Sequence, residues 1–309
     1  MNALLTITAA AAGLAVAGTA SAQLIAYEGF DVPPYLEAGL NGQNPGASAT
    51  SFGWDGAWSV GSANLQGNAG SLNNAATAYD DATTGKGRYI ANSFDFFRSG
   101  NRKVNTYAGA DTYYMSMFVN AGGSFLGSGS REYATAGFTN FYGGNEFNNA
   151  AGSGNVFGLM AGFRGEDAGA DADQADLILR ARGASGDLED TVLLSNVDSN
   201  TYHVLYKLEV NVGGGSADQV TYWVNPSDLT DEAAMSASSA ATGTVSTFAM
   251  DTNTAIDRFS VTSSNWARSM FFDEARFGYD LDSVTGIPTP AAAGLLGLGG
   301  LLAARRRRA

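Results

Sequence analysis

The chain has 309 residues, is rich in glycine (40 residues) and contains no cysteine. Without cysteine, a disulfide framework, a thiol nucleophile and a cysteine-ligated zinc site are all excluded. All 30 acidic residues, and all but four of the 17 basic ones, lie in residues 23–286, which therefore carry a net charge of −17. Such a negative charge argues against nucleic acid and anionic lipid as partners.

The first 22 residues have the pattern of an export signal. Residues 3–18 form an uncharged run of Ala, Leu, Ile, Val, Thr and Gly, and Ala20-Ser21-Ala22 follows it before Gln23. A short apolar run followed by an A-x-A site is typical of a secretory signal peptide, although the first two residues here carry no basic side chain. We expect signal peptidase to cut between Ala22 and Gln23.

Alternation of apolar and polar residues predicts strands along residues 23–286. From Tyr202 to Val212 every second residue is apolar, and the residues between them are polar except for Leu205. Residues 112–120 carry large apolar groups on both faces, which favours a place in the middle of a sandwich. Gly213-Gly214-Gly215 joins two alternating segments and predicts a hairpin. Further strands are expected at residues 24–30, 88–97, 133–142, 156–164, 176–182, 191–196, 219–225, 258–262 and 270–279.

Many short strands with no helix predicted between them favour an all-β fold for residues 23–286. We expect a two-sheet antiparallel β-sandwich of the jelly-roll type. Its length suits one large domain, because all-β domains can reach about 250 residues without splitting. Short apolar helices are expected only in the two terminal signals, residues 1–22 and 287–309.

Five phrases follow one another along the body. They are Tyr27-Glu28-Gly29-Phe30-Asp31, Leu40-Asn41-Gly42-Gln43-Asn44, Gly53-Trp54-Asp55-Gly56-Ala57-Trp58, Val224-Asn225-Pro226 and Phe272-Asp273-Glu274-Ala275-Arg276-Phe277-Gly278. Together they resemble the laminin-G/concanavalin A-like jelly rolls of exported PEP-CTERM proteins. The resemblance implies the fold and export, and it implies that the first and last strands are neighbours in one sheet. We therefore expect residues 24–30 to pair with residues 270–279, which would bring Glu28 near Asp273.

The C-terminal segment, residues 287–309, resembles the PEP-CTERM sorting signal, which a membrane-embedded exosortase reads. Its three parts are Pro288-Thr289-Pro290, an apolar run over residues 291–304, and the basic cluster Arg305, Arg306, Arg307 and Arg308. The family's usual Pro-Glu-Pro has Thr289 at its centre here. The apolar run is shorter than the roughly 20 residues of a stable membrane span. The resemblance implies transient membrane attachment through this tail and a destination at the cell surface or in the extracellular matrix; the alternative is a buried C-terminal helix.

The sequence contains few residues in patterns that support catalysis. The only histidine, His203, falls on the polar face of an expected strand, where we expect it to be solvated, and no G-x-S-x-G motif is present. A glycosidase needs two carboxylates about 5–9.5 Å apart. The carboxylates that stand two residues apart fall in turns or beyond the last strand, and they are Asp171/Asp173, Asp187/Glu189 and Asp280/Asp282. We therefore expect that the protein is not an enzyme.

Calcium is the candidate metal, because hard cations bind several oxygen ligands in turns. Residues 166–176 contain five acidic side chains, and Asp171, Asp173 and Asp176 are the candidate ligands; the alternative is a solvated acidic turn. Glu28 and Asp273 form a second candidate calcium site. Its alternative is a pair of carboxylates satisfied by backbone N–H groups or by Arg276.

Aromatic side chains supply the binding hypothesis, since flat sugar faces stack on Trp and Tyr. The candidates are Trp54, Trp58 and Tyr142, and for the two tryptophans core and exposed placements both remain open. We predict an exported, non-enzymatic protein whose jelly roll binds carbohydrate or matrix polysaccharide. The alternatives are a polysaccharide-degrading hydrolase or lyase, which needs a groove with paired carboxylates or a central basic residue, and a purely structural matrix protein.

Overall fold

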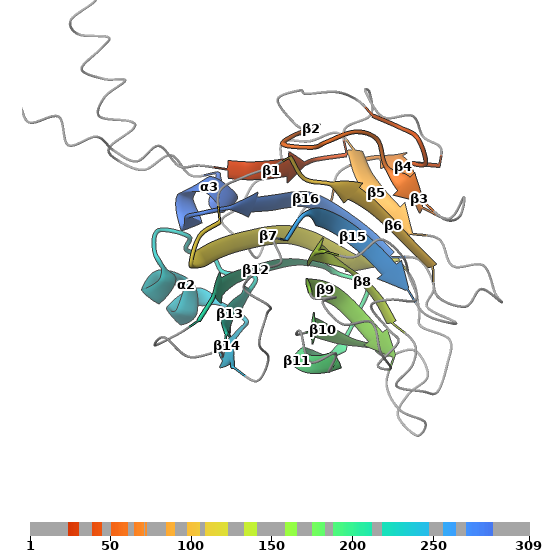
Figure 1. The fold of residues 1–309 in the computed structure, drawn as a ribbon. Coiled ribbons are helices and arrows are strands. Elements are labelled where there is room, and N and C mark those ends of the chain that lie inside the picture. The colour runs from red at the N-terminus through yellow and green to blue at the C-terminus, as the bar shows by residue number, and fades with distance from the viewer. Residues whose placement is uncertain are drawn as a thin grey trace, which may run out of the picture. The chain divides into compact units, whose positions relative to one another are not determined.

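Two antiparallel β-sheets face each other in the computed structural model of the chain (Figure 1). The structure describes residues 24–30, 39–44, 51–60, 65–70, 72, 85–89, 98–105, 109–122, 133–140, 158–165, 175–182, 188–211, 218–246, 256–263 and 270–286. All of them lie within one compact unit, Ala22–Ile287. The predicted signal peptide and sorting tail lie outside the described residues and stay predictions.

The first sheet has nine strands and contains both ends of the described chain. Along its main path the order is β14 (Ala241–Val245), β13 (Gln219–Val224), β12 (Thr201–Glu209), β7 (Thr112–Ala121), β16 (Met270–Gly278), β1 (Leu24–Glu28) and β2 (Ser51–Phe52). β5 (Gly85–Tyr89) pairs with β16 and with β4 (Leu65–Ala69).

The second sheet has seven strands. Their order is β11 (Leu188–Val197), β10 (Ala175–Arg182), β9 (Gly158–Gly165), β8 (Tyr133–Thr139), β15 (Arg258–Ser263), β6 (Arg98–Lys103) and β3 (Ser59–Val60). The two sheets confirm the predicted all-β, two-sheet antiparallel sandwich.

Three predictions about strand pairing are confirmed. β1 pairs with β16, with Tyr27 opposite Arg276 and Glu28 opposite Ala275. β7, which carries apolar groups on both faces, lies inside the nine-stranded sheet between β12 and β16. β12 pairs with β13 as the glycine triplet indicated, although the turn itself lies outside the described residues.

The main hydrophobic core lies between the two sheets. Alternate residues of each strand point into it, such as Met115 and Met117 of β7, since successive side chains of a strand point to opposite faces. An aromatic cluster fills one part of this core. Each of its rings lies within 6.4 Å of at least two others from centroid to centroid, and they belong to Phe30, Trp58, Phe259 and Phe272.

The outer face of the nine-stranded sheet is covered by a second, smaller hydrophobic cluster. It includes Leu205 of β12 and Met235 of the short helix α2 (Glu232–Ser238). A second short helix, α3 (Leu281–Thr285), follows β16 and contributes Val284. Each helix begins at an aspartate whose side chain accepts a backbone hydrogen bond, Asp231 for α2 and Asp280 for α3.

These two helices were not predicted, and they explain why Leu205 breaks the alternation of β12: it packs beneath them. No helix of the described residues is long and apolar enough to cross a membrane.

Candidate functional site

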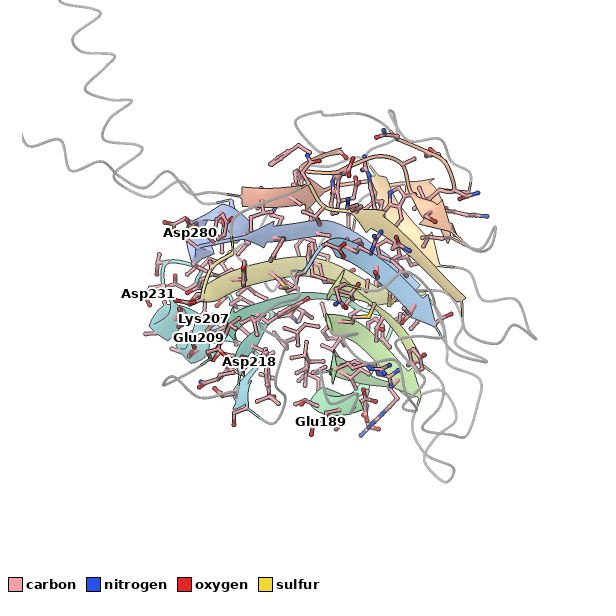
Figure 2. All side chains as sticks on the ribbon, viewed as in Figure 1. Glu189, Lys207, Glu209, Asp218, Asp231 and Asp280 are labelled. Carbon is pink, nitrogen blue, oxygen red and sulfur yellow. The ribbon has the colours of Figure 1, made fainter. Side chains whose placement is uncertain are left out.

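The outward face of the seven-stranded sheet is polar. The side chains that point from this sheet toward the other sheet, such as Ala134, Leu159 and Leu179, belong to the core between the sheets. The outward positions of the described strands carry mostly charged, amide and hydroxyl groups, with Met160 and Ile178 as the apolar members. We call them the polar face: Asn101, Lys103, Tyr133, Thr135, Thr139, Met160, Arg164, Asp176, Ile178, Arg180, Arg182, Asp190, Arg258, Ser260 and Thr262. Figure 2 shows side-chain nitrogens gathered beside β10 and β11, near the labelled Glu189.

Four charged residues of the polar face form one ion cluster. Arg180 donates from Nε to Asp190 Oδ1 over 2.6 Å and from Nη2 to Asp190 Oδ2 over 2.7 Å, which is a bidentate pair. Arg164 links this pair to Asp176, with Nη1 lying 3.5 Å from Asp190 Oδ2 and Nη2 lying 3.1 Å from Asp176 Oδ2. The cluster therefore joins β9, β10 and β11 through two cations and two anions.

Tyr133 of β8 lies at one end of this cluster. The guanidinium carbon of Arg180 is 3.6 Å from the centroid of the Tyr133 ring, a cation–π contact that fixes both side chains. Gly162 of β9 lies between Arg180 and Tyr133 in the register of the sheet. Its neighbours Met160 and Arg164 pair with Arg180 and with Tyr133, respectively. A Cβ at Gly162 would lie 2.1 Å from the carbonyl oxygen of Ala134, so β8 and β9 can approach this closely only with glycine here.

Among the residues that the structure describes, two buried polar atoms of the ion cluster find no hydrogen-bond partner. Arg180 is 3% exposed and its Nη1 is unpaired, while Asp176 is 6% exposed and its Oδ1 is unpaired. A buried donor or acceptor left without a partner costs about 1–3 kcal/mol. The cluster thus contains one hydrogen-bond donor and one acceptor that the described residues leave unsatisfied. Arg164 keeps 24% of its side chain exposed, so the cluster meets solvent on that side.

Hydroxyl groups continue the polar face across β8 and β15. The hydroxyls of Thr135 and Thr262 are 3.2 Å apart, and those of Thr139 and Ser260 are 2.7 Å apart. Arg258 Nη1 donates to Asn101 Oδ1 over 3.1 Å at the β6 side. These side chains are buried, so their hydrogen bonds fix them rather than leave them free to turn.

The two tryptophans with predicted ligand-binding roles lie against the core. Trp58 is 2% exposed and packs on Phe30 and Phe259, so it has the core placement. Trp54 is half-buried, donates from Nε1 to the carbonyl oxygen of Tyr27 over 2.8 Å, and has the guanidinium of Arg102 above its ring at 5.3 Å. Trp58 is thus a core residue, and one face of the Trp54 ring is taken by Arg102. Tyr142 lies outside the described residues.

Glu28, a predicted calcium ligand, is fully buried beside Arg102 of the opposite sheet. Arg102 Nη1 donates to the Glu28 carboxylate and to Ser51 Oγ, and Nη2 donates to Asn44 Oδ1 over 2.9 Å. The backbone N–H of Phe30 also points to Glu28 Oε1 at 3.4 Å. The charge of Glu28 is therefore balanced by an arginine within the protein.

Asp273, the second member of that predicted calcium pair, accepts two backbone hydrogen bonds. They come from Leu72 N over 3.0 Å and from Glu274 N over 2.9 Å, at an irregularity of β16 where Glu274 adopts a positive φ of 51°. Arg276 pairs with Glu274 rather than with Asp273. Backbone N–H groups bind Asp273 as the alternative for this pair has it, whereas the arginine beside Glu28 is Arg102 and not Arg276. Calcium binding at this pair stays a prediction.

The acidic segment of residues 166–176 is described only at its end. Asp176 is the second residue of β10 and binds Arg164, whereas Asp171 and Asp173 lie outside the described residues. Among the residues that the structure describes, no group of three or more His, Asp or Glu side chains is arranged to hold a metal ion. Calcium binding at Asp171 and Asp173 stays a prediction.

His203 is buried, which corrects the expectation of a solvated histidine. It is 1% exposed, its Nε2 lies 2.8 Å from Ser116 Oγ, and its ring contacts Phe118 at a centroid distance of 5.0 Å. Burial, with a smaller contribution from the positive charge of nearby Arg276, lowers the pKa of His203 to about 3. The imidazole is therefore neutral at physiological pH. The polar neighbours along β12 gave no sign that the second hydrophobic cluster covers this face.

The ion cluster itself was not predicted as a site. Alternate residues in the expected strand 176–182 are Asp176, Ile178, Arg180 and Arg182, a polar face within a strand that is otherwise apolar. That pattern was a usable signal. The partner Asp190 could not be found in this way, because it depends on the register between β10 and β11.

Comparison with known proteins finds no matching family model and no matching curated protein. Solved structures with a similar fold include the alginate lyase from Aplysia kurodai, with 12% identity over 64% of this chain and 84% of that chain and a TM-score of 0.41. They also include the alginate lyase vAL-1 from Chlorella virus (10% identity, 72% and 93% coverage, TM-score 0.40) and the carbohydrate recognition domain of Emp47p (12%, 70% and 88%, 0.39).

The described residues form an all-β sandwich of two antiparallel sheets. These distant likenesses concern the fold alone.

Proposed function

We propose that this chain is an exported protein whose jelly roll binds carbohydrate at the polar face without catalysing a reaction. The observation that supports this most is the pair of buried unpaired atoms in the ion cluster, Arg180 Nη1 and Asp176 Oδ1. A sugar hydroxyl can accept a hydrogen bond and donate one, so sugars suit a site that offers both a donor and an acceptor.

The proposed location rests on the two terminal segments. A signal peptidase would remove residues 1–22, and an exosortase-type enzyme would recognise Pro288-Thr289-Pro290 with the basic cluster that follows the apolar run. The protein would then contact the membrane only through its C-terminal tail and act at the cell surface or in the extracellular matrix.

A glycan array tests the binding function. We expect the purified protein to bind a defined set of glycans, and Arg180→Gln to lose that binding. Lys207→Gln is the matched control, because it removes one positive charge on the outer face of the other sheet, where Lys207 pairs with Glu232 of α2 (Figure 2). Equal loss of binding in both variants would place the binding site away from the polar face. The array run with and without calcium tests the metal requirement.

A polysaccharide lyase or hydrolase is the second candidate function. It is favoured by two arginines, Arg164 and Arg180, that lie beside Tyr133 near the middle of the seven-stranded sheet, since a central basic residue is what that class requires. Incubation of the protein with a panel of polysaccharides, followed by assays for reducing ends and for the ultraviolet absorbance of unsaturated sugars, separates the two. Products that Arg180→Gln fails to make would favour the enzyme.

A further inference from the structure

We propose that the polar face recognises a neutral glycan, through its hydroxyl groups, and not a glycan that carries carboxylate or sulfate groups. This inference rests on the proposed carbohydrate binding and narrows the chemical class of the ligand. It follows from three features of the molecule: the charge balance of the ion cluster, the two atoms that the cluster leaves unpaired, and the charge of the whole body.

The ion cluster is balanced within itself. Arg164 and Arg180 are matched by Asp176 and Asp190, and each arginine has a carboxylate oxygen within 3.1 Å. A carboxylate or sulfate of a ligand would meet arginines that are already neutralised. It would also lie beside two aspartates of its own sign, which disfavours an anion at this position.

Two further basic residues of the polar face also lie near carboxylates. Arg258 Nε lies 3.4 Å from Asp257 Oδ1, and Lys103 Nζ lies 3.1 Å from Asp55 Oδ2. Because these basic residues lie near carboxylates, the polar face attracts anions less than its number of basic residues indicates.

The two unpaired atoms need partners with opposite hydrogen-bonding roles. Arg180 Nη1 needs an acceptor, and Asp176 Oδ1 needs a donor. An ionised carboxylate or a sulfate can only accept, so it could satisfy Arg180 but not Asp176. A sugar hydroxyl can do either, and two hydroxyls of one sugar could satisfy both atoms.

The charge of the body acts in the same direction over longer distances. Residues 23–286 carry a net charge of −17. A polyanion approaching the protein would have to overcome this potential, while a neutral glycan would not. Local and long-range electrostatics thus agree on the class of ligand.

The test compares neutral and acidic glycans on the same protein. Isothermal titration calorimetry would use matched oligosaccharides, one neutral, one with uronate groups and one sulfated, at low and at high sodium chloride. We expect binding of the neutral glycan with a Kd that changes little with salt, because screening acts on ionic contacts and not on hydroxyl hydrogen bonds. We expect the acidic glycans to bind about tenfold more weakly or not at all.

Asp176→Asn gives the two ligand classes opposite outcomes. Arg164 Nη2 donates to Asp176 Oδ2, so the amide oxygen of the variant would keep that place and its NH₂ would replace the unpaired acceptor. Neutral-glycan binding should fall by about tenfold, since a hydroxyl donor loses a charged acceptor. Binding of an acidic glycan should instead become stronger, because one like charge is gone. Glu209→Gln removes one negative charge on the outer face of the other sheet and should change neither (Figure 2).

Binding restricted to acidic glycans, or stronger binding of the neutral glycan by Asp176→Asn, overturns the neutral-glycan inference while carbohydrate binding stands. Loss of binding at high salt overturns it in the same way. No binding of any glycan rejects the proposed function itself. The comparison of glycans and salt on the unaltered protein does not depend on how well a variant folds.

Discussion

Arg102 of β6 and Glu28 of β1 form an ion pair that joins the two sheets, and their side chains are 1% and 0% exposed. The guanidinium group also donates to the carbonyl oxygen of Gly56 through Nε, over 3.1 Å. Removal of one partner from such a pair leaves an uncompensated buried charge.

Glu28→Ala should therefore lower the free energy of unfolding by about 3–5 kcal/mol, measured by urea denaturation. The double change Glu28→Met with Arg102→Met should recover most of this loss, since no buried charge is left unpaired. The exposed pair of Lys103 and Asp55, at 45% and 59% exposure, is the control, and Asp55→Ala should cost about 0–1 kcal/mol. A Glu28→Ala protein as stable as Asp55→Ala would contradict the assignment of this pair.

His203 makes stability depend on pH in one direction. Its pKa is about 3 in the folded protein, against an ordinary value near 6.5, so the unfolded chain binds a proton more readily. The stabilisation from the neutral imidazole is present above about pH 6.5 and is lost as pH falls toward about 3, by up to about 1.4 kcal/mol for each pH unit. His203→Gln removes one proton that is taken up on unfolding. The free energy of unfolding of this variant should therefore fall less steeply across that window. Identical pH profiles for both proteins would show that His203 titrates normally.

Calcium is tested by melting temperature. If Asp171 and Asp173 bind calcium, the melting temperature should rise with calcium, because a ligand that binds only the folded state stabilises it. The double change to Asn at both positions should abolish that rise without lowering the calcium-free melting temperature. A rise that persists in the double variant would show that calcium binds at other residues. No rise in the unaltered protein would indicate that the acidic segment is a solvated turn.

Processing at both ends is open to intact-mass analysis. We expect the protein recovered from the cell surface or matrix to begin at Gln23 and to lack residues 305–308. The reason is the short apolar run behind Pro288-Thr289-Pro290, which is too short for a stable span. A mass that includes the tail would make residues 287–309 a retained membrane anchor instead.

Period-two alternation was enough to predict most of the longer strands, because one face of each strand must meet the core. The pairing of β1 with β16 came instead from the resemblance of the terminal phrases to concanavalin A-like jelly rolls. Five strands of two to six residues escaped prediction, because so few residues carry little alternation: β2 (Ser51–Phe52), β3 (Ser59–Val60), β4 (Leu65–Ala69), β6 (Arg98–Lys103) and β14 (Ala241–Val245). The helix α2 had a readable signal in Asp231, a side chain suited to begin a helix.

The environment of individual polar residues was harder to predict. His203 looked solvated because its neighbours on β12 are polar, yet residues about thirty positions later pack over that face. The ion cluster depends on the register of β9, β10 and β11, which no single strand encodes. Sequence patterns thus predicted the strands, while the candidate site needed their three-dimensional arrangement.

A crystal structure of the protein with a glycan selected on the array tests the central claim most directly. We predict a sugar bound at the polar face, with oxygens within about 2.7–3.2 Å of Arg180 Nη1 and of Asp176 Oδ1. A sugar bound elsewhere, with these two atoms still unpaired, would contradict the assignment of the ion cluster as the carbohydrate site.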